Sequence, residues 1–161
     1  MKRLWKVLFL ATVVAVLTFT SVMATNPHFI YAVTSVNATG QLVVSWKEAG
    51  LGNNVLVAYK ATADSVALWG CINGGGNHPQ AANKETVSGP LSAEGSFRSG
   101  KNGQIKAALT FGPILSTPDF ECPPGQKLRL LEVYYTNIQL TDITNGLPTL
   151  FLPDVSRVFF P

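Results

Sequence analysis

The stretch "QKLRLLEVYYTNIQLTDIT" (126–144) decides the fold class, because it is the longest segment rich in β-branched and aromatic residues. It lacks the i, i+3, i+4, i+7 apolar spacing of an amphipathic helix. Alternation places Leu131, Val133 and Tyr135 on one face of a strand. The apolar residues predicted for the opposite face are Tyr134, Ile138 and Leu140. Apolar residues on both faces predict a central strand, or a bulge near Leu130 and Leu131 that shifts the alternation by one.

Shorter segments of the same kind occur along the rest of the chain, separated by Gly, Asn and Pro. They are "FIYAVTSV" (29–36), "QLVVSWKE" (41–48), "VLVAYKATA" (55–63), "SVALWGCI" (65–72), "ETVSGPLSAEGSF" (85–97), "QIKAALTF" (104–111) and a last strand within 155–160. Seven or eight short strands without intervening helices predict an all-β antiparallel sandwich. An immunoglobulin-like Greek key is the expected topology, with a jelly roll as the alternative. The core predicted from these segments comprises Leu42, Val44, Trp46, Val55, Val57, Tyr59, Val66, Leu68 and Trp69.

The N-terminus has the three regions of a secretory signal peptide. Basic Lys2, Arg3 and Lys6 precede an apolar run from Val7 to Leu17, and small residues end at Ala24. The apolar run is too short for a membrane span, which needs about twenty residues. We therefore expect a signal peptide at 1–24, one sandwich domain at 25–161, and a secreted, extracellular protein.

The charge of the exported domain excludes one class of partner. The net charge of +3 comes from 12 basic and nine acidic residues, and three of the basic ones lie in the signal peptide. Nine basic residues then balance nine acidic ones, so no bias towards nucleic acid or an anionic membrane remains. The expected partners are an extracellular glycan or protein, with no nucleic acid and no membrane after signal cleavage.

The only two cysteines, Cys71 and Cys122, predict a disulfide in an oxidising compartment. A bridge between them closes a loop of about fifty residues, worth roughly 4 kcal/mol as a ceiling. Neither belongs to a C-x-x-C pair, and His28 and His78 are the only histidines. The chain therefore has too few cysteine and histidine ligands for a four-ligand zinc site unless carboxylates complete it, and no metal or cofactor is predicted.

The loop "CINGGGNHPQAANK" (71–84) is the best candidate for a binding surface. A phosphate loop needs separated glycines before a helix, whereas these three glycines are contiguous and no helix is predicted after them. We instead expect a long polar loop anchored at Cys71. The residues predicted to bind a ligand there are Asn73, Asn77, His78 and Lys84.

No complete catalytic set is apparent, and no catalytic residue is assigned. A hydrolase that uses His78 with an acidic residue remains an alternative, because such sites are assembled from distant parts of a chain. Asp119 with Glu121 is the only close carboxylate pair with alternate spacing, which fits glycoside hydrolysis, a solvated edge or two oxygens of a calcium site. Asp142 with Asn145 is a second calcium candidate and is more typical of a turn. The aromatic residues Trp46, Trp69, Tyr134 and Tyr135 fit either a sugar-stacking platform or, more typically, the core.

Five phrases together resemble a group of small secreted microbial proteins with no assigned activity. They are "KEAGLG" (47–52), "CINGGGNHPQAANKE" (71–85), "SGKNGQ" (99–104), "CPPGQ" (122–126) and "YTNIQLTDITNG" (135–146). The resemblance implies one secreted β-domain with both cysteines in its signature, and it transfers no catalytic residue. The expected function is a non-catalytic module, structural or binding a glycan or protein through its loops; the alternatives are the His78 hydrolase and a calcium-dependent adhesion domain.

Overall fold

The computed structural model describes residues 26–75 and 83–160 and contains eight strands. The strands are β1 (His28–Val36), β2 (Leu42–Ala49), β3 (Leu56–Ile72), β4 (Lys84–Arg98), β5 (Ile105–Phe111), β6 (Lys127–Asp142), β7 (Leu150–Leu152) and β8 (Val155–Val158). None of the described residues forms a helix long and apolar enough to cross a membrane. The expected signal peptide, 1–24, lies outside the described residues.

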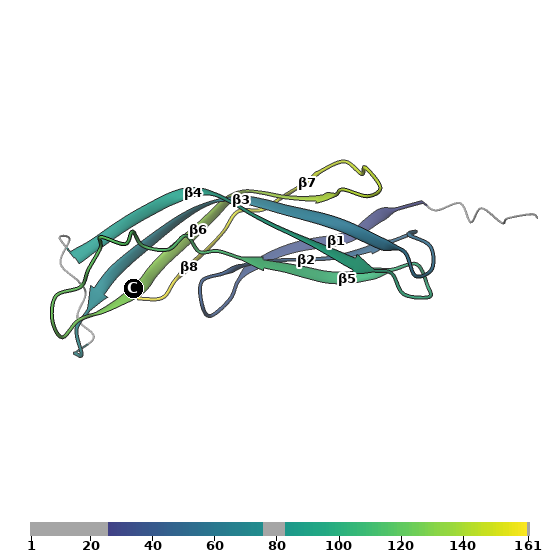
Figure 1. The fold of residues 1–161 in the computed structure, drawn as a ribbon. Helices are drawn as coiled ribbons and strands as arrows, with labels where there is room; N and C mark the ends of the chain where they lie inside the picture. Colours follow the sequence, from purple (N-terminus) through teal and green to yellow (C-terminus); the bar gives the residue numbers. More distant parts are fainter. Residues whose placement is uncertain (1–25, 76–82, 161) are drawn as a thin grey trace, which may run out of the picture.

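The strands form two antiparallel sheets packed face to face, which confirms the predicted all-β sandwich (Figure 1). One sheet has the order β1-β2-β5, and the other has the order β4-β3-β6-β7, with β8 also paired to β6. The hairpins β1–β2 and β3–β4 each stay within one sheet. The connections β2–β3, β4–β5 and β5–β6 pass from one sheet to the other. The Greek-key topology stays a prediction.

The core follows the alternation of β2 and β3. Leu42, Val44 and Trp46 of β2 have no exposed surface, as predicted. The buried apolar residues of β3 that face them are Val57, Tyr59, Ala61, Ala63 and Ala67. Val55 and Trp69 are half-buried against this core. Alternate positions of both strands therefore form the contact between the two sheets.

The prediction of two strands at 55–63 and 65–72 was wrong, because β3 runs without a break through Asp64. Asp64 is exposed on the outer face of the long sheet, where water solvates its charge, so it does not end the strand. The alternation of the first half therefore continues, and it turns Val66 and Leu68 outward. Val66 is accordingly 39% exposed rather than part of the core.

Two irregularities in β6 explain why its apolar residues do not follow a simple alternation. The pairing with β3 shifts beside Leu131, which confirms the predicted bulge. It shifts again at Asn137, whose φ of 51° lies in the left-handed region that asparagine tolerates. The second bulge returns Ile138 and Leu140 to the core, so the prediction that they face away from Leu131 was wrong. Tyr134 alone of the predicted opposite face is exposed.

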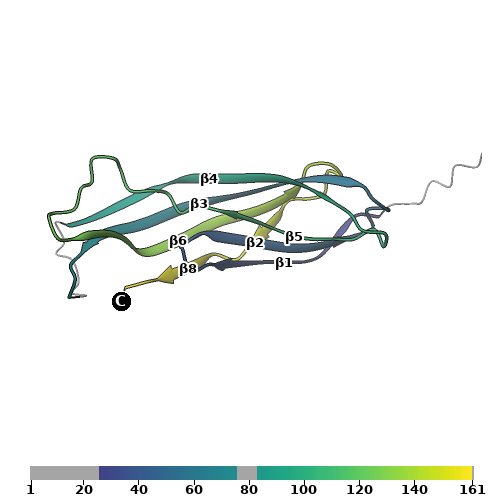
Figure 2. The ribbon, with the colours of Figure 1, turned by 60° about the horizontal axis from the view of Figure 1, so that its bottom comes forward.

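The two sheets differ in length, and this difference creates the candidate site. β3, β4 and β6 have 17, 15 and 16 residues, whereas β2 and β5 have 8 and 7. The long strands project past the short sheet at one end of the sandwich (Figures 1 and 2). We call this the disulfide end, because Cys71 lies there. β1 begins at the other end.

Candidate functional site

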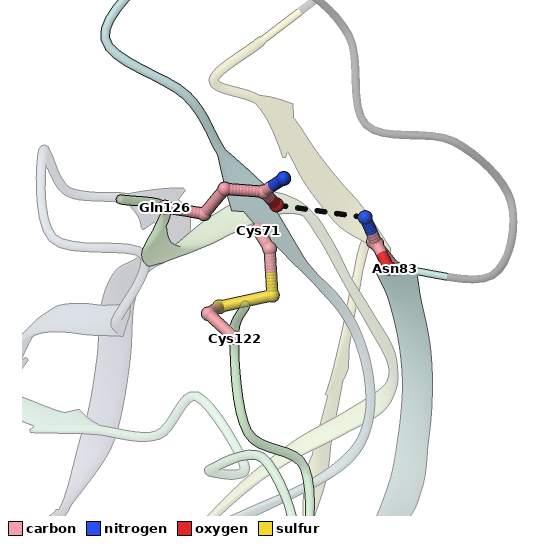
Figure 3. Close-up of a disulfide and its surroundings, with 4 residues drawn as sticks. All are labelled: Cys71, Asn83, Cys122 and Gln126. Atoms are coloured by element: carbon pink, nitrogen blue, oxygen red, sulfur yellow. Dashed lines mark hydrogen bonds between the residues drawn. A yellow bond between two sulfur atoms is a disulfide. The ribbon is translucent and has the colours of Figure 1, made fainter. Parts of the chain in front are cut away.

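The connection between β5 and β6 covers the inner face of the projecting strands. Cys71 is joined to Cys122 of this connection, with the Cα atoms 5.4 Å apart, which confirms the predicted disulfide (Figure 3). The indole nitrogen of Trp69 donates a hydrogen bond to the carbonyl of Ile114 at 3.0 Å. Thr117 donates from its backbone nitrogen and its hydroxyl to the carboxylate of Glu85. The connection is therefore fixed at three points.

The base of the loop between β3 and β4 is held as well. The amide of Asn83 donates to Gln126 Oε1 at 3.5 Å, across the strand that carries Cys71 (Figure 3). The side-chain oxygen of Asn73 accepts a hydrogen bond from the backbone nitrogen of Gly75 at 3.2 Å. Both described ends of the loop are thus ordered by local hydrogen bonds beside the disulfide.

The turn between β1 and β2 forms the opposite side of the site. Asn37 Oδ1 accepts hydrogen bonds from the backbone nitrogens of Thr39 and Gln41, at 3.0 and 2.9 Å. The buried hydroxyl of Tyr135 donates to the carbonyl of Gly40 at 2.6 Å. Burial raises the pKa of Tyr135 to about 12, so this hydroxyl remains a donor at physiological pH. The turn is therefore held to β6 by a buried bond.

A groove of about 620 Å³ lies between this turn and the start of β6. Its lining residues are Ala38, Thr39, Ile72, Asn73, Gly74, Gly125, Lys127, Arg129, Leu130, Phe159 and Phe160. The lining of the groove thus combines apolar side chains with two cations and several polar groups. Arg157 lies over the ring of Phe159 at 5.2 Å, whereas Phe160 is 41% exposed.

The cations of the groove belong to a larger group on the outer face of the long sheet. Gly70 of β3 is paired with Arg129 on one side and with Lys84 on the other. Ile72, two residues further, is paired with Lys127. Directly paired residues point to the same face of a sheet, so all three cations share this face. Gly70 places no side chain between Lys84 and Arg129.

None of these three cations is neutralised by an ion pair in the described part of the chain. The single salt bridge found there joins Lys60 to Glu94, at 2.9 Å and on another part of the sheet. The nearest acidic residue in sequence, Glu85, faces inward and binds Thr117. Within the described residues, Lys84, Arg129 and Lys127 therefore form a local concentration of positive charge.

Two of the four residues predicted to bind are described, and the structure brings both to the disulfide end. Asn73 lines the groove, and Lys84 lies across Gly70 from Arg129. Asn77 and His78 lie outside the described residues. Sequence reasoning missed Lys127, Arg129, Phe159 and Phe160, although the Lys-x-Arg alternation at the start of a strand was a visible signal of two cations on one face.

The described residues do not assemble a catalytic or metal site of the kinds considered. His28 contacts the carbonyl of Asn26 at the far end of β1, and the proposed base His78 lies outside residues 26–75 and 83–160. No group of three potential metal ligands occurs within those ranges. Both carboxylate oxygens of Asp142 accept hydrogen bonds from Asn145, at 2.9 and 2.6 Å, which is the geometry of a turn. Asp119 and Glu121 are exposed on the connection.

Glu48 is a buried carboxyl group inside the sandwich, far from solvent. Neither of its oxygens has a well-formed hydrogen-bond partner among the residues that the structure describes, and its exposed fraction is zero. Burial raises the pKa of Glu48 to about 7; Tyr59 lowers it, and nearby Asp142 raises it further. Glu48 is therefore protonated in weakly acidic conditions and charged above neutral pH.

The aromatic residues considered for a sugar platform separate into two groups. Trp46 and Tyr135 are fully buried, and Trp69 is half-buried against the connection. Trp46 packs against Tyr59 and Phe97, with ring centroids 4.7 and 5.4 Å away. Only Tyr134, at 45% exposure, remains available on the surface. A platform of all four is excluded because three of them build the interior.

Comparison with known proteins adds no family to these observations. No protein-family model matches the chain, and no curated protein matches it in sequence. The function is therefore argued from the groove.

Proposed function

We propose that this chain is a secreted, non-catalytic β-sandwich module that binds an acidic extracellular glycan in the groove at the disulfide end. The observation that carries the proposal is that two cations, Lys127 and Arg129, line the same groove as several apolar side chains. The disulfide supports an oxidising, extracytoplasmic location, where such glycans occur.

The lining of the groove matches the two kinds of surface on an acidic sugar. A sugar ring has an apolar face of C–H groups, which packs on exposed ring carbons such as those of Phe160. Its carboxylate or sulfate group accepts charge-assisted hydrogen bonds from Lys127 and Arg129. Its hydroxyl groups exchange hydrogen bonds with polar side chains such as Thr39.

The walls of the groove are fixed before any ligand arrives. The bond from Tyr135 to Gly40 holds one wall, and the disulfide at Cys71 holds the other. Binding to such a site requires little ordering of the backbone, so less of the interaction energy is lost on association. This favours recognition of a small ligand by a preformed groove.

The test is isothermal titration calorimetry of the exported domain with oligosaccharides of hyaluronan, alginate and polygalacturonate, and with neutral chitin oligosaccharides. We expect at least one carboxylated oligosaccharide to bind and the neutral ones to bind more weakly. Affinity should fall as salt rises, because exposed charges are screened. Lys127→Ala with Arg129→Ala should weaken binding at least about a hundredfold, since the two hydrogen bonds to charged groups each contribute about 1.5–3 kcal/mol.

A matched control removes two positive charges from a different surface of the domain. Lys47 and Lys106 are paired across β2 and β5, on the outer face of the short sheet. Lys47→Ala with Lys106→Ala should leave the affinity within about twofold. The proposal fails if no carboxylated oligosaccharide binds, or if both double variants weaken binding equally. Binding of an acidic protein segment in preference to every glycan would also refute the glycan assignment.

A further inference from the structure

The outer face of the long sheet begins beside the groove, at the paired residues Ile72 and Lys127, and runs along β3 towards the middle of the sandwich. Its successive residues on β3, from the disulfide end inward, are Ile72, Gly70, Leu68, Val66, Asp64 and Thr62. We call this surface, with the facing residues of β4, β6 and β7, the outer track. Ile72 and Thr62 are ten residue steps apart on β3, which is about 33 Å at the usual rise of a strand. The track therefore extends well beyond Lys127 and Arg129, the cations of the groove.

A second hollow, of about 400 Å³, lies on this track where β6 bulges. Its polar lining residues are Lys60, Thr62, Asp64, Ser92, Asn137 and Gln139. The bulge turns the amide of Asn137 towards Asp64, to which it donates at 2.6 Å. The hollow thus presents amide, hydroxyl and carboxylate groups together.

The second hollow has no unpaired cation among its described lining residues, in contrast to the groove. Lys60 is paired with Glu94, and the carboxylate of Asp64 is bonded to Asn137. Glu132, nearer the groove, accepts a hydrogen bond from the hydroxyl of Tyr134. A uniformly anionic chain would therefore meet carboxylates here, whereas an uncharged sugar would meet hydrogen-bonding groups.

Phe151 flanks the hollow and has no evident role in folding. It is paired with Gln139 across β6 and β7, so it lies in the same row of the outer face as Thr62. Its side chain is 78% exposed, which leaves most of its apolar surface in water. An exposed aromatic ring beside amide groups provides the stacking face and the hydrogen bonds that a neutral sugar needs.

From these observations we propose that the module binds an extended polysaccharide in which acidic and neutral sugars alternate. An acidic residue occupies the groove at Lys127 and Arg129, and the chain follows the outer track to the hollow beside Phe151. Tyr134, 45% exposed, lies between the two sites. This inference rests on the proposed function, and it adds the ligand's length and its alternation of charge.

The test compares a hyaluronan tetrasaccharide, which is shorter than the track, with a hyaluronan decasaccharide by calorimetry. Hyaluronan alternates a carboxylated and an uncharged sugar. We expect the decasaccharide to bind at least about tenfold more tightly, which exceeds the gain from its several equivalent registers, because occupying a second linked site is intramolecular. Phe151→Ala should abolish that gain and leave the tetrasaccharide affinity unchanged.

Leu115→Ala is the control, since Leu115 is 73% exposed on the connection and away from the track. It should retain the full length dependence. Equal affinity for both lengths in the unmodified protein, or a gain that survives Phe151→Ala, would overturn the inference and leave the groove proposal intact. Binding of oligogalacturonate without any binding of hyaluronan would also overturn the alternating-sugar inference and leave the groove proposal intact. If no acidic oligosaccharide binds, the proposed function itself fails.

Discussion

Glu48→Gln should remove a pH dependence of stability that originates in the buried carboxyl group. In the folded protein the pKa of Glu48 is raised from 4.5 to about 7, with burial as the largest cause. A raised pKa means that the folded state favours the protonated form. The stabilisation of the folded state by this protonation is complete below the unfolded pKa of about 4.5. It is lost as the pH rises through the folded pKa of about 7.

The magnitude follows from the size of the shift. Each unit of pKa corresponds to about 1.36 kcal/mol, so the unfolding free energy should fall by about 3 kcal/mol between pH 4.5 and 8 because of Glu48. Glutamine is uncharged throughout this range. The difference in stability between the variant and the unmodified protein should therefore change by about 3 kcal/mol, in favour of Glu48→Gln at the higher pH.

The assay is urea unfolding at intervals from pH 4 to pH 8, with the difference between the two proteins plotted against pH. The difference cancels the contributions of the other titrating groups. Glu94→Gln is the control, because it makes the same chemical change at an exposed ion pair. Its stability relative to the unmodified protein should change by less than about 1 kcal/mol between pH 4 and pH 8. Parallel stability curves for Glu48→Gln and the unmodified protein would refute the argument.

Three further predictions concern the disulfide, the turn and calcium. Replacing Cys71 and Cys122 by Ser should cost up to about 4 kcal/mol of unfolding free energy, measured with denaturant; an unchanged midpoint would show that the bridge is not a structural constraint. Gly40→Ala should cost about 1–3 kcal/mol, because φ is 88° and the new Cβ would lie 2.2 Å from Leu130. Gly146→Ala is the control, because Gly146 has a φ of 65° but an added Cβ would meet no atom within 4 Å. If Gly146→Ala cost as much unfolding free energy as Gly40→Ala, the clash with Leu130 would be refuted as the cause. Excess chelator should leave the melting temperature unchanged, and a fall of several degrees would instead support a calcium-dependent adhesion domain.

The sequence predicted the fold class because alternation in strands is a local signal. The segments at 29–36, 41–48 and 104–111 agree with β1, β2 and β5 to within one residue at each end. β3 was divided at Asp64 because a charged residue between two apolar runs resembles a turn. Only the pairing of Asp64 with a second strand shows that the charge lies on a solvated face of one long strand.

The candidate site was only partly predictable, because it depends on residues that are distant in sequence. Asn73 and Lys84 were found through the unusual composition of their loop. Lys127 becomes a neighbour of Ile72 only through the pairing of β3 with β6, and Phe160 reaches the groove only because β8 pairs with β6. Neither pairing leaves a signal in a single sequence, since strand partners are chosen by tertiary packing.

The most direct test of the central claim is an NMR titration of the isotopically labelled domain with the carboxylated oligosaccharide that binds most tightly. Ligand contact should shift the backbone amide signals of Lys127 and Arg129, and the ring signals of Phe160, in a saturable manner. Signals of Lys47 and Lys106 on the short sheet should remain unchanged. Saturable shifts confined to the end of the sandwich where β1 begins, with the groove signals unmoved, would contradict the claim that this groove is the binding site.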